Sequence, residues 1–279
     1  MIPFTKANAC GNDFLIVTQD AAAGYDWADL TRSLCARNTG IGADGVEFFA
    51  WNDIGASSNS GRIRLHNADG SVAEISGNGT RCVAAWMAEA LGSKPGDELE
   101  IVTDAGLRVC RVNAVDTSSG FTVEVSTGMG TPTFAPRTVN LADCVWVNGV
   151  EVSTGNPHFV IAVNDAEFTS NYGYDWQTLG AGVCRHQDFP HQTNVEFVRI
   201  VSEHEIEIRI WERGVGATSS SGTGSSAAAT AAIALHGCKS PLTVVASGGA
   251  QTVLWDGPGT ELTLIGPANL IARGETFYK

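Results

Sequence analysis

The feature that most constrains this 279-residue chain is an internal repeat. The segment Ser76-Gly77-Asn78-Gly79 opens an Ala-rich run, and Ser221-Gly222-Thr223-Gly224 opens a second one. Further stretches recur in the same order at offsets of 144 to 149 residues: Gly11-Asn12 as Gly155-Asn156, Tyr25-Asp26-Trp27 as Tyr174-Asp175-Trp176, Val46-Glu47-Phe48 as Val195-Glu196-Phe197, and Ile63-Arg64 as Ile208-Arg209. Self-similarity in a fixed order indicates a repeated structural unit. The sequence therefore predicts two copies of one α/β unit in a pseudo-two-fold arrangement.

The two Ala-rich runs predict buried helices. Residues 225–235 contain no charged residue, and a helix that is apolar on every side must be surrounded by protein. The first run is nearly as apolar. We expect an α+β fold with two pseudo-symmetric domains, 1–130 and 131–279, each a curled, mostly antiparallel sheet around a central helix. The turn-rich stretch 127–140 marks the boundary, and the extreme C-terminus is a candidate to return to the N-terminal domain.

Local signals predict the remaining elements. Asp26 can cap a helix over 27–37, and a second helix is expected over 176–186. Asn148-Gly149, between two valine-rich runs, predicts a hairpin turn. Strand-like runs occupy 13–18, 46–49, 62–66, 98–103, 107–113, 121–126, 158–163, 194–200, 204–211, 242–246, 251–255, 261–265 and 268–272.

Composition narrows the class of partner. The net charge of −13 argues against nucleic acid or an anionic membrane as a main partner. Seven scattered cysteines argue against a zinc site or a disulfide framework. Neither an apolar leader nor a run of 18 apolar residues occurs. We therefore expect a cytoplasmic protein without a metal that acts on a small molecule.

Polar residues gather at the repeated positions. The N-terminus of a helix binds anions, so two such ends could hold a charged small molecule in a cleft between the domains. Asparagines can bind both an ammonium and a carboxylate, Arg213 can bind a carboxylate through two hydrogen bonds, and His158 and Glu212 are candidate bases. The candidates are Asn12, Asn67, Ser76, Asn78, Asn156, His158, Asn194, Glu212, Arg213, Ser221 and Thr223.

Each candidate also has a purely structural interpretation. Asn156 precedes a proline and suits a turn, His158 can be a structural histidine beside a strand, and Glu212 can form an exposed ion pair with Arg213. A serine at the start of a helix is commonly only its N-cap. The glycine-rich segments lack the Gly-Lys-Ser/Thr ending of a phosphate-binding loop.

Over nearly its whole length the chain resembles the diaminopimelate epimerase family, within the cofactor-independent amino-acid racemases and isomerases. The matching stretches are Gly11-Asn12-Asp13-Phe14, Gly40-Ile41-Gly42-Ala43-Asp44-Gly45, Asn67-Ala68-Asp69-Gly70-Ser71, Gly77-Asn78-Gly79, Arg81-Cys82, Gly155-Asn156-Pro157-His158, Thr193-Asn194-Val195-Glu196-Phe197, Glu212-Arg213-Gly214 and Gly222-Thr223-Gly224. The resemblance implies a two-domain fold, an active site in the cleft, no cofactor, lysine and peptidoglycan biosynthesis, and a homodimer.

The resemblance also implies a two-base mechanism. One cysteine removes the α-hydrogen, a second cysteine delivers a proton to the opposite face, and a His and a Glu assist them. His158 and Glu212 match the assisting residues. The residues that match the family's substrate-binding groups are Asn12, Asn67, Asn156, Asn194 and Arg213, with backbone N–H groups of Gly77, Asn78, Gly222 and Thr223.

The chain departs from the family at the two catalytic cysteines, which are Ser76 and Ser221. Ala217 also stands where Glu is common. The pKa of a hydroxyl lies far above that of a thiol, which is near 8.5, so a hydroxyl forms a free base roughly 8–10 kcal/mol less readily. Three interpretations stay open: an active epimerase, a natural or engineered Cys-to-Ser homologue that binds an amino acid, and a related isomerase or dehydratase.

Overall fold

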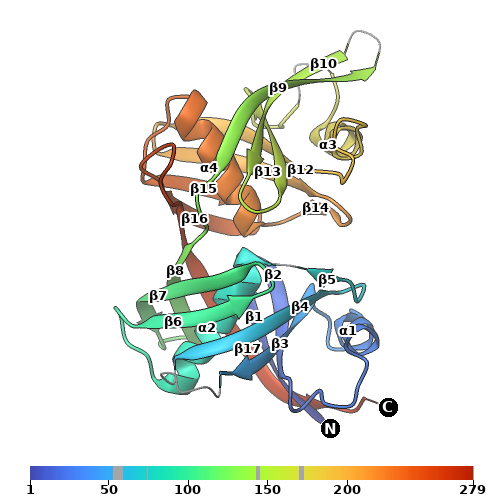
Figure 1. The fold of residues 1–279 in the computed structure, drawn as a ribbon, viewed down its shortest axis with the longest axis vertical. Helices are drawn as coiled ribbons and strands as arrows, with labels where there is room; N and C mark the ends of the chain where they lie inside the picture. The colour runs from blue at the N-terminus through green and yellow to red at the C-terminus, as the bar shows by residue number, and fades with distance from the viewer. Residues whose placement is uncertain (53–58, 74, 143–144, 170–172, 279) are drawn as a thin grey trace. The chain divides into compact units, whose positions relative to one another are not determined.

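The computed structural model describes residues 1–52, 59–73, 75–142, 145–169 and 173–278. By its internal contacts the chain divides into a first unit, Met1–Thr127 with Gly266–Lys279, and a second unit, Gly128–Ile265. Compared with the predicted domains, residues 128–130 group with the second unit, and the C-terminal segment groups with the first. Figure 1 shows the sheet and helices of each unit.

The first unit is a curled sheet with one helix inside it. Its elements are β1 (Ile2–Ala9), β2 (Asn12–Thr18), α1 (Trp27–Cys35), β3 (Gly45–Trp51), β4 (Ser60–Asn67), β5 (Val72–Ala73), α2 (Gly77–Leu91), β6 (Glu98–Thr103), β7 (Gly106–Asp116), β8 (Phe121–Gly128) and the second part of β17 (Thr263–Thr276). The strands pair in the order β17-β1-β2-β3-β4-β6-β7-β8, and β8 pairs again with β17. Among the described strand pairs of this unit with a defined register, β2–β3 and β4–β6 are parallel and the others are antiparallel.

The second unit has the same order of pairings. Its elements are β9 (Thr133–Ala142), β10 (Val145–Ser153), β11 (Pro157–Val163), α3 (Trp176–Cys184), β12 (Asn194–Ser202), β13 (Glu205–Glu212), β14 (Gly216–Thr218), α4 (Gly222–Leu235), β15 (Leu242–Ala246), β16 (Gly249–Leu254) and the start of β17. The order is β9-β10-β11-β12-β13-β15-β16-β17, with parallel pairing at β11–β12 and β13–β15. The predicted α+β fold class is confirmed.

The central helices form the cores of the two sheets. In α2, Cys82 to Ala85 are fully buried among side chains of β1, β2, β4, β6, β7 and β8. In α4, Ala227 to Ala232 are fully buried among side chains of β10 to β13, β15 and β16. Alanine suits these positions because its small side chain lets strands approach the helix from several sides, and it favours helix. The outer helices α1 and α3 begin at the N-caps Asp26 and Asp175.

Two local predictions are wrong in detail. Asn148-Gly149 is no hairpin turn, because both residues lie inside β10 and pair with Thr138 and Arg137 of β9. Glycine is needed there because a Cβ atom on Gly149 would come within 2.5 Å of the Phe159 ring. The two strands expected over 261–272 form one long strand, β17. The division between the units, after Thr127, falls within the predicted boundary stretch 127–140, which also contains most of β9.

The described helices include none that is long and apolar enough to cross a membrane. The six described cysteines are buried and form no disulfides with one another. Cys144 lies outside the described residues.

Candidate active site

In the first unit, Ser76 is the N-cap of α2. Its backbone is extended, and its Oγ accepts a hydrogen bond from the backbone N–H of Gly79 at 3.0 Å. The N-cap serine satisfies one of the donors that the first turn of a helix leaves without an intrahelical partner. Ser76 is half-buried, so its hydroxyl combines a structural role with access to a ligand.

A chain of side-chain hydrogen bonds passes beside Ser76. Arg81 Nη2 donates to Asn78 Oδ1 at 2.6 Å, Asn78 Nδ2 donates to Asn12 Oδ1 at 3.3 Å, and Asn12 Nδ2 donates to Asp44 Oδ2 at 2.5 Å. The donors all point away from the helix and toward the Asp44 carboxylate. The structure therefore brings together Asn12 and Asn78, two of the predicted binding residues.

Asn67 ends β4 and forms a turn. Its Nδ2 donates to Ser71 Oγ at 3.1 Å, and its backbone N–H donates to the carbonyl oxygen of Ser71 at 2.8 Å. These bonds fix the turn that follows β4 and leave the half-buried side chain of Asn67 at its end.

In the second unit, Ser221 is the N-cap of α4. Its Oγ accepts from the backbone N–H of Gly224 at 3.2 Å and lies 3.4 Å from Thr223 Oγ1. Ser221 is 6% exposed. Ser221 thus repeats the N-cap geometry of Ser76 and has one additional hydroxyl neighbour.

His158 is fully buried on β11, where both ring nitrogens have partners. Nδ1 lies 2.7 Å from Glu196 Oε1, and Nε2 lies 2.9 Å from Asn156 Oδ1. Asn156 Nδ2 donates to Thr223 Oγ1 at 3.3 Å. His158 therefore connects to Ser221 through Asn156 and Thr223.

The other predicted residues of this unit lie at the ends of β12 and β13. Asn194 Oδ1 accepts from the backbone N–H of Arg213 at 3.0 Å, which holds the turn after β13 to the start of β12. The Arg213 guanidinium donates to the carbonyl oxygen of His191 at 3.3 Å and is exposed. Glu212 is half-buried and pairs with Gly216 of β14 in the ladder.

Two buried glutamates escaped the sequence-based site prediction. Glu47 and Glu196 are fully buried on β3 and β12, and each lies against the fourth residue of a Ser-Gly-x-Gly segment. A Cβ atom on Gly79 would overlap Glu47 Oε1, and one on Gly224 would come within 2.9 Å of Glu196 Oε1. The sequence contains a pattern that could have identified them, because both glutamates occur in the repeated Val-Glu-Phe triplet within apolar strands.

The two glutamates differ in their surroundings. Among the described residues, neither carboxyl oxygen of Glu47 has a hydrogen-bond partner, and burial raises the pKa of Glu47 to about 8. Burial also raises the pKa of Glu196, although the charge and the hydrogen bond of His158 oppose this rise. Phe14 on β2 occupies the position in the first repeat that His158 has in the second, which explains why Glu47 lacks an imidazole partner.

The buried cysteines provide no replacement for the missing thiols. Cys82 and Cys110 are fully buried, and burial raises the pKa of both, that of Cys110 to about 11. Within the described ranges, no three His, Cys, Asp or Glu side chains are close enough together to hold a metal ion.

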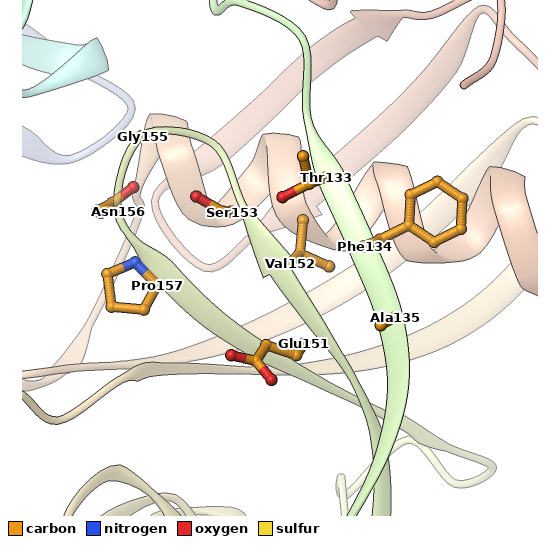
Figure 2. Close-up of a pocket in the computed structure, with 9 residues that line it drawn as sticks. All are labelled: Thr133, Phe134, Ala135, Glu151, Val152, Ser153, Gly155, Asn156 and Pro157. Atoms are coloured by element: carbon orange, nitrogen blue, oxygen red, sulfur yellow. The ribbon is translucent and has the colours of Figure 1, made fainter. Parts of the chain in front are cut away.

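A pocket of about 410 Å³ opens beside the turn between β10 and β11. Figure 2 shows its lining, which β9, β10 and that turn provide. Among the described residues that line it, Asn156 alone belongs to the predicted site. The pocket therefore lies beside the N-terminus of α4, because Asn156 bonds to Thr223.

Comparison with known proteins places this geometry in a family. A family profile described as diaminopimelate epimerase matches residues 4–135 and 150–271. The diaminopimelate epimerases of Phocaeicola vulgatus and Thermosynechococcus vestitus are 33% and 34% identical to the chain, each over 98% of both sequences.

Solved structures share the fold at low identity. A protein of Pseudomonas aeruginosa described as a predicted epimerase superposes with a TM-score of 0.75 at 16% identity and covers 100% of both chains. A probable proline racemase of Agrobacterium radiobacter gives a TM-score of 0.73 at 14% identity, covering 100% of this chain and 94% of its own.

Proposed function

This chain belongs to the diaminopimelate epimerase family, and on that premise we propose that it inverts the α-carbon of an amino acid without a cofactor. The substrate that the curated relatives favour is diaminopimelate, converted from the LL to the meso form in lysine and peptidoglycan biosynthesis. We also propose a cytoplasmic homodimer, which light scattering of the purified protein would test.

The observation that carries this proposal is the paired construction of the two helix starts. Each begins with a serine N-cap, and beside each a half-buried asparagine bonds to the helix residue two positions after the serine, Asn12 to Asn78 and Asn156 to Thr223. Helix N-termini favour carboxylates. Asparagine amides can bind both the carboxylate and the ammonium of an amino acid.

The proposed mechanism assigns one acid–base group to each unit. One serine removes the α-hydrogen and the other donates its proton to the opposite face. Asn12, Asn67, Asn156, Asn194 and Arg213, with the backbone N–H groups of the two helix starts, hold the substrate. His158 and Glu212 assist the serines. His158 acts at a distance in this arrangement, because its nitrogens bond to Glu196 and Asn156.

Serines at positions 76 and 221 predict slow turnover. Forming a free alkoxide base costs up to roughly 8–10 kcal/mol more than forming a thiolate, if no neighbour takes the proton. The same observation favours a second candidate function, an amino-acid-binding homologue with impaired turnover. Both candidates use the same binding groups and differ only in proton transfer.

The deciding experiment follows the α-proton. The chain is incubated with LL-diaminopimelate in D₂O, and the α-proton signal is followed by NMR, with Ser76→Ala/Ser221→Ala as the inactive control. We expect loss of the α-proton signal and formation of the meso isomer. Calorimetric binding without exchange would support the binding homologue, and neither binding nor exchange would refute both functions. Loss of water from a 3-hydroxy amino acid would indicate a dehydratase instead.

A further inference from the structure

Ser221 lies at the end of a continuous chain of polar side chains that begins at a buried carboxyl group. The links are Glu196 Oε1 to His158 Nδ1 at 2.7 Å, His158 Nε2 to Asn156 Oδ1 at 2.9 Å, Asn156 Nδ2 to Thr223 Oγ1 at 3.3 Å and Thr223 Oγ1 to Ser221 Oγ at 3.4 Å. All five residues belong to the second unit.

The partners of His158 and Asn156 set the direction of donation as far as Thr223. His158 Nε2 faces the amide oxygen of Asn156, which only accepts, so Nε2 carries a hydrogen. Thr154 Oγ1 also donates to that oxygen, at 3.3 Å, which leaves the amide nitrogen to donate to Thr223. Because Thr223 Oγ1 accepts this bond, its own hydrogen can continue the series toward Ser221. Hydrogen bonds aligned in one direction strengthen one another.

Glu196 holds the far end of this chain. It faces His158 Nδ1, so one proton lies between the carboxyl oxygen and the ring while Nε2 keeps its hydrogen. Glu196 and His158 are fully buried, and Thr223 is 7% exposed. In such a dry environment polar interactions are stronger than in water.

The equivalent chain in the first unit runs the other way. Asn78 occupies the place of Thr223 in the repeat, yet it donates to Asn12, which in turn donates to Asp44. Ser76 Oγ accepts a hydrogen bond from the backbone N–H of Gly79. The side-chain hydrogen bonds therefore lead toward the serine in the second unit and away from it in the first.

We propose that the Thr223 hydroxyl donates a hydrogen bond to Ser221 Oγ and stabilises Ser221 when it carries negative charge. Thr223 is then a positioning residue, oriented by Asn156, His158 and Glu196, and Ser221 is the stronger acid of the two serines. This inference rests on the proposed function, in which Ser221 exchanges a proton with the α-carbon.

The proton-transfer step balances without a further reagent. When Ser221 acts as the acid, its O–H bond breaks, a C–H bond forms at the α-carbon, and the electron pair of the broken bond stays on Oγ. The resulting alkoxide has two donors, the Gly224 N–H at 3.2 Å and the Thr223 hydroxyl. Both contacts are long in the resting state, and hydrogen bonds to a developing charge shorten and strengthen.

The first test measures acidity at position 221 without turnover. Ser221→Cys places a titratable thiol there, and its alkylation by iodoacetamide is followed against pH by peptide mass spectrometry. Adding Thr223→Val should raise the midpoint by about one pH unit, because the thiolate loses a donor. Adding Thr223→Ser should leave the midpoint unchanged.

A matched control separates this effect from a general change in the helix. Thr230 lies in the same helix and is buried, and its hydroxyl bonds to the carbonyl oxygen of Ser226 at 2.8 Å. Adding Thr230→Val to Ser221→Cys should not move the midpoint. An unchanged midpoint with Thr223→Val, or an equal shift with Thr230→Val, would overturn the proposal.

The second test uses the proposed reaction. Thr223→Val should lower kcat for α-proton exchange of diaminopimelate about 10- to 100-fold with KM unchanged, and Thr223→Ser should restore it. A rise in KM with unchanged kcat would overturn the role in proton transfer. If the wild-type chain exchanges no α-proton, the proposed function fails, while the alkylation midpoints still decide the role of Thr223.

Discussion

The N-termini of α2 and α4 have the same backbone conformation. They differ in the direction of the side-chain hydrogen bonds around them. Ser76 and Ser221 cap α2 and α4 in the same way, at 3.0 and 3.2 Å from the N–H of the third following residue. Beside each helix start lies a buried glutamate. Glu196 pairs with His158, whereas the carboxyl oxygens of Glu47 have no hydrogen-bond partner in the part of the chain that the structure describes. The two units thus share the same caps, while different side chains at equivalent positions give different hydrogen bonds.

The difference has a consequence for chemistry. In the first unit the hydrogen bonds end on Asp44, a carboxylate that stays out of the proposed reaction. In the second unit they end beside Ser221. The two serines are therefore equivalent as structural caps and unequal as acids, and each of the following changes tests one side of that statement.

The largest effect is expected from thiols at both positions. Ser76→Cys with Ser221→Cys should raise the rate of α-proton exchange by ~10³-fold or more, because thiolates form near neutral pH and alkoxides do not. Of the single changes, Ser76→Cys should give the larger gain, since Ser221 already has a second donor. The rates are measured by NMR in D₂O. A double variant no faster than wild type would show that the thiols are not what this chain lacks.

The next effect concerns Glu47 and pH. Because its folded-state pKa is raised from 4.5 to about 8, the folded state binds more protons than the unfolded state between these values. The contribution of Glu47 to the free energy of unfolding is therefore fully present below pH 4.5. It falls as pH rises toward 8, by up to about 1.4 kcal/mol per pH unit. Glu47→Gln removes this titration and should make the protein more stable at pH 8. Urea unfolding at pH 5 and pH 8 checks it, and an equal pH dependence in the variant and wild type would contradict it.

A smaller effect should follow from filling the space beside each glutamate. Gly79→Ala forces a methyl group against Glu47 and should destabilise the first unit by about 2 kcal/mol, as overpacking does. Gly224→Ala meets Glu196 at 2.9 Å and should cost less than about 1 kcal/mol, because the helix propensity of alanine offsets part of the strain. Thermal unfolding by calorimetry measures both, and the reverse order would contradict the tighter contact in the first unit.

The smallest effect tests the equivalence of the caps. Ser76→Ala and Ser221→Ala should each destabilise the protein by about 1 kcal/mol, because each removes one N-cap acceptor. Chemical unfolding should show similar losses for the two variants. Losses that differ by more than about 1 kcal/mol would mean that one serine stabilises its helix through more than the cap.

Prediction from sequence succeeded where local chemistry decides the structure. The two serines and Asp26, candidate caps in the sequence, are N-caps because their side chains bond to backbone N–H groups three residues away. It failed at Asn148-Gly149, where a strong turn signal lies inside a strand because the Phe159 ring needs the space of a glycine. The contact between these residues depends on strand pairing, which the local pattern does not encode.

The sequence by itself determined the repeat, the two buried central helices, the α+β class and the family, because these follow from residue order and from the periodicity of apolar side chains. Only the tertiary structure decided what the polar residues do. The pairing of Glu196 with His158 and the bond of Asn156 to Thr223 join side chains that lie far apart along the chain. The Glu47 oxygens, which have no hydrogen-bond partner among the described residues, are likewise buried by distant elements. Folding brings them together, and burial away from water then gives each contact its strength.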